Sequence, residues 1–278
     1  MFDSGMRQIT NILPQLSVLF LSLILISGSP GIPSIKTNVV PAYDSTYKTI
    51  HVMVALCDNT YQGIVPVPAA IGNGQNPGSN LYWGCGYGVR TYFSNSPVWK
   101  RVKTIKRDSV LMERVIYRHR TKNYYLVADA YNGKYIKQCT INFLNACCGK
   151  LKDTILADRG ILGIGGHSSL LAYVGHDGLM DFSLPDSFTN SDGKKRSCVI
   201  LACSSRTYFT PLLKSTGSYP LVWTTGLMCP EAYTLHDIVN GFIDRKSNQE
   251  IRSLAANAYH RYQKCGEKAA HNLFVSGW

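Results

Sequence analysis

The sequence lacks several motifs that would identify its chemistry at once. Its nine cysteines include no Cys-x-x-Cys pair, and no other spacing in the chain is typical of a zinc site. It has no Gly-x-Ser-x-Gly elbow, which argues against a serine hydrolase. The glycines of residues 160–166 are not followed by Lys-Ser or Lys-Thr, so they form no P-loop and predict a flexible turn. We therefore expect neither a metal ion nor another cofactor.

Acidic residues are scarce relative to basic ones. The chain has 17 Asp and Glu against 29 Lys and Arg, a formal net charge of +12. Such a charge is compatible with acidic partners, but no nucleic-acid-binding motif accompanies it. The basic residues are dense in residues 98–119, where they alternate with apolar ones and predict two strands with one solvated basic face. We expect no nucleic-acid partner.

Long apolar runs are also scarce. Residues 12–26 form such a run after a short segment carrying Arg7, and the small residues Ser27-Gly28-Ser29 follow it. The run is short for a membrane span, so residues 1–29 are predicted to be a secretory signal peptide, with an uncleaved N-terminal anchor as the alternative. No later stretch is apolar enough to cross a bilayer. We expect a secreted or cell-envelope protein with no stable membrane insertion after signal cleavage.

The rest of the chain predicts one exported domain. Residues 30–47 contain three prolines and are interpreted as a linker, and residues 48–278 as a single domain without internal repeats. The odd number of cysteines leaves at least one free thiol in an exported protein, and Cys203 is the natural choice. Cys57 and Cys198 lie in apolar runs, which predicts small buried side chains.

Short apolar runs bounded by turn residues predict the secondary structure. Such runs are typical of buried strands, most often in a parallel sheet. One segment instead shows helical periodicity, over residues 136–147, and Gly149 is placed to end that helix. Strands that alternate with helices favour an α/β fold with a mostly parallel sheet. The predicted strands are residues 49–56, in the middle of the sheet, and residues 124–128, 170–174, 198–202 and 219–225.

Two of these strands end in residues suited to covalent catalysis. The strand of residues 170–174 is followed by Gly175-His176-Asp177-Gly178, and that of residues 198–202 by Cys203-Ser204-Ser205. The carboxyl ends of parallel strands meet at one edge of a sheet, where α/β proteins bind their ligands. A thiol and an imidazole brought to that edge can act as nucleophile and base.

An apolar strand ending in Gly-His-Asp-Gly, followed by one ending in Ala-Cys-Ser, resembles the caspase, legumain and gingipain group of cysteine peptidases. In that group a His-Gly pair ends one strand and an Ala-Cys pair ends the next. About 35 residues carry the resemblance. It implies a caspase-like three-layer α/β/α sandwich with a mostly parallel central sheet. This sequence departs from the pattern in one respect, because Asp177 separates His176 from Gly178.

The resemblance also implies roles in the hydrolysis of a polypeptide substrate. Cys203 would attack the peptide carbonyl and form an acyl-enzyme, while His176 would protonate the departing amine and then activate water. The backbone N–H groups of Cys203 and Gly178 would form the oxyanion hole. Asp177 or Asp58 could help orient the imidazole.

Further features bear on the reactivity and selectivity of this site. Residues 206–214 predict a short helix whose N-terminus would lower the pKa of the Cys203 thiol. The resemblance places the pocket for the residue preceding the cleaved bond along the next strand. The sequence leaves open which residue this pocket prefers. A pocket for Arg or Lys would need a buried acid, and Glu231 lies near this strand. The predicted substrate-binding residues are Trp223, Thr224, Thr225 and Gly226.

Two other functions are compatible with the same residues. One is a catalytically inactive peptidase-like protein that binds a peptide or a surface partner, for which the inserted Asp177 is the best support. The other is an envelope amidase or esterase that uses the Cys203 and His176 pair on a different substrate. The sequence favours the peptidase, and it leaves the oligomeric state open.

Overall fold

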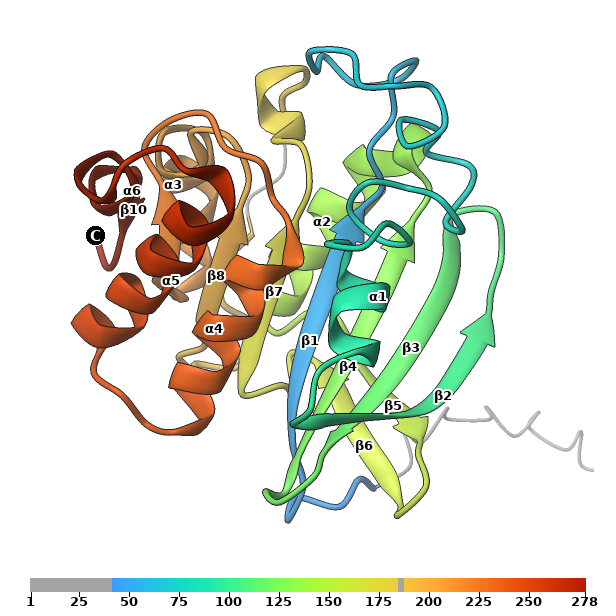
Figure 1. Ribbon diagram of the computed structural model, residues 1–278. Helices are drawn as coiled ribbons and strands as arrows, with labels where there is room; N and C mark the ends of the chain where they lie inside the picture. Colours follow the sequence, from blue (N-terminus) through green and yellow to red (C-terminus); the bar gives the residue numbers. More distant parts are fainter. Residues whose placement is uncertain (1–41, 185–187) are drawn as a thin grey trace, which may run out of the picture. The chain divides into compact units, whose positions relative to one another are not determined.

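The computed structural model describes residues 42–184 and 188–278 (Figure 1). The predicted signal peptide of residues 1–29 lies outside the described residues, as does most of the predicted linker. The end of that linker, residues 42–47, leads into the first strand without regular secondary structure. Among the helices of the described residues, none is long and apolar enough to cross a membrane.

The apolar runs form one large mixed sheet of eight strands. All five predicted strands are confirmed, and the first of them lies in the interior of the sheet with parallel neighbours on both sides. The basic segment forms two strands, as predicted; they pair antiparallel with each other, and the first of them lies at one edge of the sheet. In order across the sheet the strands are β10 (Phe274–Val275), β9 (Tyr219–Thr224), β8 (Ser197–Leu201), β7 (Leu170–Val174), β1 (Lys48–Ala55), β4 (Tyr124–Tyr131), β3 (Leu111–His119) and β2 (Trp99–Lys106).

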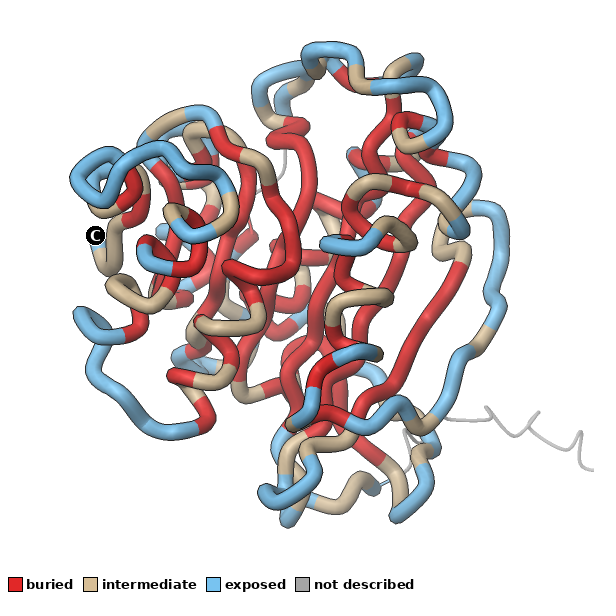
Figure 2. Tube along the Cα trace, viewed as in Figure 1, coloured by how far each residue is buried: buried red, intermediate tan, exposed pale blue. Residues whose placement is uncertain are grey.

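Helices cover both faces of this sheet, which gives the predicted three-layer α/β/α arrangement (Figure 1). Successive side chains of a strand point to opposite faces, so β1 serves both layers. Ile50, Val52 and Val54 pack in one core with α1, α4 and α5, whereas Met53 and Ala55 pack in the other with α2 and α3. Figure 2 shows these central strands buried. The helices are α1 (Val89–Ser94), α2 (Ile136–Cys147), α3 (Ser205–Thr216), α4 (Ala232–Ile243), α5 (Asn248–Gln263) and α6 (Glu267–Leu273), with 3₁₀ turns η1 (Gly133–Tyr135) and η2 (Gly178–Met180).

The glycine-rich segment before β7 is not the flexible turn that we predicted. It forms an antiparallel hairpin of β5 (Lys152–Leu156) and β6 (Ile161–Gly165). Glycine serves close backbone approach here, since a Cβ at Gly163 would lie 2.9 Å from the ring of Tyr43. The hairpin covers part of the sheet through a small apolar core made by Leu162 and Ile164 with Ile116, Tyr125 and Val127.

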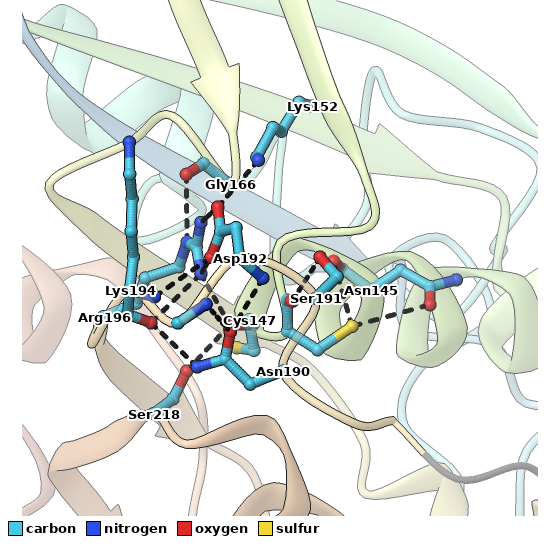
Figure 3. Close-up of polar contacts among 12 residues, drawn as sticks. Asn145, Cys147, Lys152, Gly166, Asn190, Ser191, Asp192, Lys194, Arg196 and Ser218 are labelled. Carbon is cyan, nitrogen blue, oxygen red and sulfur yellow. Dashed lines mark hydrogen bonds and ion pairs between the residues drawn. The ribbon is translucent and has the colours of Figure 1, made fainter.

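The start of β8 is tied to three other segments by the buried side chain of Arg196 (Figure 3). Its Nε donates to the carbonyl of Gly166 at 2.9 Å, and its Nη2 donates to Asp192 Oδ2 at 2.6 Å. Nη1 reaches the carbonyl of Cys147 at the end of α2, at 3.5 Å. Lys152 of β5 adds a second cation to Asp192, at 2.7 Å. The cluster therefore connects α2, the hairpin and the loop before β8.

We predict that Arg196→Ala lowers the free energy of unfolding by about 3 kcal/mol, because it removes a buried charged donor and takes from the Gly166 carbonyl its Arg196 partner. Urea denaturation followed by circular dichroism measures the change. Arg196→Lys is the matched control: it keeps the charge but loses the two-pronged contact with Asp192, so its loss should be smaller. A change below about 1 kcal/mol for the alanine variant would contradict this role.

Candidate active site

The pairing of β7 with β8 places His176 and Cys203 at corresponding positions. Val174 lies opposite Leu201 in the parallel ladder. His176 and Cys203 each follow their paired residue by two positions. The N–H of Gly175 donates to the carbonyl of Leu201 at 3.2 Å, which extends the pairing one residue further. Because neighbouring strands lie about 4.8 Å apart, the two residues leave the sheet side by side.

The turn between β7 and His176 requires glycine. Gly175 has a φ of +147°, in the region that residues with a Cβ rarely adopt. A Cβ at this position would also lie 2.7 Å from the carbonyl oxygen of Ala55 on β1. The chain can therefore pass the end of β1 and deliver His176 to the sheet edge only because this residue has no side chain.

His176 and Cys203 line one pocket of about 290 Å³ at the carboxyl ends of the strands. The pocket has one wall from the loop after β1, one from the end of β7 and η2, and one from the loop after β9. The structure thus brings the predicted nucleophile and base together at a cavity. Its other lining residues are Gly63, Ile64, Val65, Val67, Leu81, Tyr82, Gly175, Met180, Leu227, Met228, Cys229 and Pro230.

The imidazole of His176 is held by a carboxylate. Its Nε2 lies 2.8 Å from Oδ2 of Asp181, and the same oxygen accepts the N–H of Gly63 at 2.9 Å. An ionised carboxylate only accepts hydrogen bonds, so Nε2 carries the proton and Nδ1 is the nitrogen free to take one. The hydroxyl of Tyr173 donates to the carbonyl of His176 at 2.8 Å and fixes its backbone. The result is a mostly buried, oriented base.

Asp181 replaces both residues that we expected to orient the imidazole. Asp58 instead caps the turn after β1, where its Oδ1 accepts the N–H groups of Thr60 and Tyr61 at 2.9 and 3.2 Å. Asp177 caps η2, because its Oδ1 accepts the N–H of Leu179 at 3.0 Å. The inserted Asp177 therefore starts the short turn that leads the chain back to Asp181. The sequence signal for this role was that Asp181 follows His176 closely along the chain.

The sulfur of Cys203 contacts the backbone of Met228. The N–H of Met228 approaches Sγ at 3.4 Å, and Sγ lies 3.5 Å from the carbonyl oxygen of the same residue. Burial raises the pKa of the Cys203 thiol, the Met228 N–H lowers it in part, and the nearby Asp177 raises it further. Among the hydrogen bonds of the described residues, none joins the sulfur to His176. The thiol therefore rests protonated.

The helix after Cys203 is present, but the pKa of the thiol is raised rather than lowered. α3 begins at Ser205, after Ser204 adopts a left-handed conformation with φ of +47°. A helix N-terminus favours negative charge nearby. Burial of the sulfur outweighs this influence, because a thiolate loses more hydration than a thiol when it is removed from water.

The predicted substrate-binding residues do not line the pocket. Trp223 and Thr224 are fully buried, and the Thr224 hydroxyl pairs with that of Ser205 at 3.0 Å. Thr225 donates through its hydroxyl to the carbonyl of Asn272 at 2.9 Å, and neither it nor Gly226 lines the cavity. The wall comes instead from the next four residues, 227–230. β9 ends at Thr224, and the chain reaches the pocket only in the loop that follows it.

Gly178 also lies outside the pocket lining. It is buried at the start of η2, where a Cβ would lie 2.7 Å from the ring of Phe182. This close packing against Phe182 explains why the residue at position 178 is glycine. Of the two predicted oxyanion-hole residues, only Cys203 lines the cavity.

Comparison of the chain with protein-family models, with curated proteins and with solved structures finds no match. Within residues 42–184 and 188–278, no group of three or more His, Cys, Asp or Glu side chains is arranged to hold a metal ion. All nine cysteines lie in this part of the chain, and each is a free thiol. The structure brings the Cys203 thiol and the His176 imidazole to the pocket, with the Asp181 carboxylate behind the imidazole.

Asp177 makes a testable contribution to stability. Its carboxyl group is buried, and Oδ2 has no hydrogen-bond partner among the described residues. Burial raises the pKa of Asp177 to about 7, which the Leu179 N–H opposes and the charge of Asp181 reinforces. The folded state thus holds a proton that the unfolded state releases near pH 4, so this group costs stability as the pH rises from about 4 to about 7.

We predict that Asp177→Asn is more stable than the unchanged protein at pH 8, by about 4 kcal/mol, and equally stable at pH 4. Asparagine still accepts the N–H of Leu179 but cannot ionise. Urea unfolding at several pH values measures the difference. The same pH dependence in both proteins would contradict the buried, proton-holding carboxyl.

Proposed function

We propose that this protein is a cysteine endopeptidase that hydrolyses peptide bonds through Cys203 and His176. The observation that carries the proposal is the shared register: each residue stands two positions beyond the paired Val174 and Leu201, and both line one pocket. Nucleophile and base are thereby held on the rigid ends of neighbouring strands, and Asp181 orients the base. A nucleophile, a base and a third group that orients the base support thiol catalysis at this pocket.

The resting thiol determines how the reaction begins. Because the pKa of Cys203 is raised, the sulfur must lose its proton as it attacks the substrate carbonyl. Nδ1 of His176 takes that proton, and Asp181 stabilises the imidazolium that results. The sulfur and imidazole share no hydrogen bond before substrate enters, and such contacts commonly tighten only in the substrate complex.

The same groups then complete the turnover. The tetrahedral intermediate carries an oxyanion, for which we propose the N–H of Cys203 as one donor. His176 gives its proton to the departing amine, and the carbon–nitrogen bond breaks to leave a thioester on Cys203. Water attacks the thioester, His176 takes a proton from it, and the carboxylic acid leaves as the thiol is restored.

The inserted Asp177 does not favour an inactive protein over an enzyme. Its carboxyl caps η2, and that turn brings Asp181 to the imidazole. The insertion therefore has a place in an intact site. An amidase or esterase would use the same pair of residues, so it differs from a peptidase in substrate rather than in machinery.

We predict that Cys203→Ala and His176→Ala each lower peptide cleavage by at least about 1,000-fold, because each removes one half of a cooperating pair. Cleavage of a mixed peptide library, followed by mass spectrometry, measures the loss. The double variant should be no worse than either single one. Cys265→Ala, which removes an exposed thiol, is the matched control and should keep full activity.

Two outcomes would count against the proposal. Full activity in both single variants would contradict the mechanism. An unchanged protein that hydrolyses simple esters or cell-wall amides, but no peptide in the library, would show the same thiol chemistry on another substrate. Loss of ester hydrolysis in Cys203→Ala would then assign the site to an esterase or amidase.

A further inference from the structure

The pocket beside Cys203 is lined almost wholly by apolar side chains. Ile64, Val65 and Val67 come from the loop after β1, and Leu227 and Met228 from the loop after β9. No Asp, Glu, Lys or Arg lines it; apart from His176, the ionisable lining residues are one tyrosine and two cysteines.

Those remaining groups are neutral near pH 7. Burial raises the pKa of Cys229 to about 12, and the nearby Glu231 adds to the shift. Burial likewise raises the pKa of Tyr82 well above its ordinary value. A charged substrate side chain in this pocket would therefore find no fixed partner, and an unpaired charge removed from water is costly.

Two acidic residues near the pocket, Glu231 and Asp181, have other contacts. Glu231, which the sequence suggested as a partner for a basic substrate residue, accepts from the hydroxyl of Tyr233 and from Nε2 of Gln263, both at 3.0 Å. It does not line the cavity. Asp181 is held by His176 and by the N–H of Gly63. Neither acid lines the cavity.

Apolar side chains also converge at the mouth of the pocket. Val65, Met180 and Leu227 are 87%, 41% and 74% exposed, and each comes from a different segment of the chain. Large apolar side chains gathered at a cavity while exposed to water are typical of a ligand-binding surface. A ligand that covered them would remove this apolar area from water.

We propose that this pocket binds an apolar side chain, such as Leu, Met or Phe, of the residue that precedes the cleaved bond. The inference rests on the peptidase function proposed above. The carbonyl attacked by Cys203 is bonded to the Cα of that residue, so its side chain enters the cavity that the sulfur lines. Met180 and Met228 are flexible and adapt the wall to apolar groups of different shape.

Thiol-directed peptidyl acyloxymethyl ketones that differ only in the residue next to the ketone test this selectivity on the full chain. Cys203 displaces the carboxylate group and forms a thioether, and intact mass measures the labelling rate. We expect Leu and Phe probes to label Cys203 at least ~10-fold faster than Asp, Asn or Lys probes. Iodoacetamide has no amino-acid side chain to enter the pocket, so its labelling rate measures the reactivity of the thiol alone.

A charge placed at the mouth should shift this preference. Leu227→Glu adds a carboxylate beside the pocket, and we expect it to raise the Lys-to-Leu ratio of labelling rates by ~10-fold. Leu156→Glu is the matched control, because Leu156 is 62% exposed at the end of β5 and does not line the cavity. Its ratio should stay unchanged, and the iodoacetamide rate of each variant gives the thiol reactivity against which its peptidyl probe rates are normalised.

The outcomes separate the pocket from the reaction. Labelling of Cys203 that depends on His176 but is fastest with Asp, Asn or Lys, or equal for all probes, overturns the apolar preference and leaves the peptidase standing. If iodoacetamide labels Cys203 while no peptidyl probe does, the peptidase function fails and the inference fails with it. Faster Leu and Phe labelling, shifted by Leu227→Glu alone, supports the inference.

Discussion

The site depends on the hydrogen-bonded pairing of β7 with β8. This ladder sets Val174 opposite Leu201, and His176 and Cys203 each follow two positions later in the chain. A shift of one residue would turn one side chain to the opposite face of the sheet, since side chains alternate along a strand. Arg196 anchors the start of β8 to α2 and to the loop before β8, at the end of this pairing opposite the site.

Burial raises the pKa of two groups of the site. It keeps the thiol of Cys203 protonated and raises the pKa of the Asp177 carboxyl to about 7, because neither group has a full set of partners for its charged form. His176 is also buried, and its imidazole has Asp181 as a partner. The resting site therefore has a protonated Cys203 thiol and an imidazole oriented by Asp181. Proton transfer, rather than a preformed thiolate, starts the proposed chemistry.

Periodicity predicted the elements whose burial depends on local pattern and missed those that depend on distant contacts. The central strand and the helix of residues 136–147 could be predicted directly from the sequence. The hairpin of β5 and β6 could not, because its glycines serve contacts with Tyr43 and the sheet. α4 contains Gly241, where a Cβ would lie 2.8 Å from Leu254 of α5, so packing between helices explains that residue.

The sequence by itself determined that a histidine and a cysteine end two buried parallel strands, because apolar runs and their turn residues are local signals. The sequence also showed Gly175 as a turn residue at the end of a strand. The structure explains why it is glycine, because a Cβ there would meet the carbonyl oxygen of Ala55. Only the tertiary structure decided that Asp181 rather than Asp58 or Asp177 holds the imidazole, and that residues 227–230 form the pocket wall. Those choices depend on where loops end in space, which contacts between distant segments settle and periodicity does not encode.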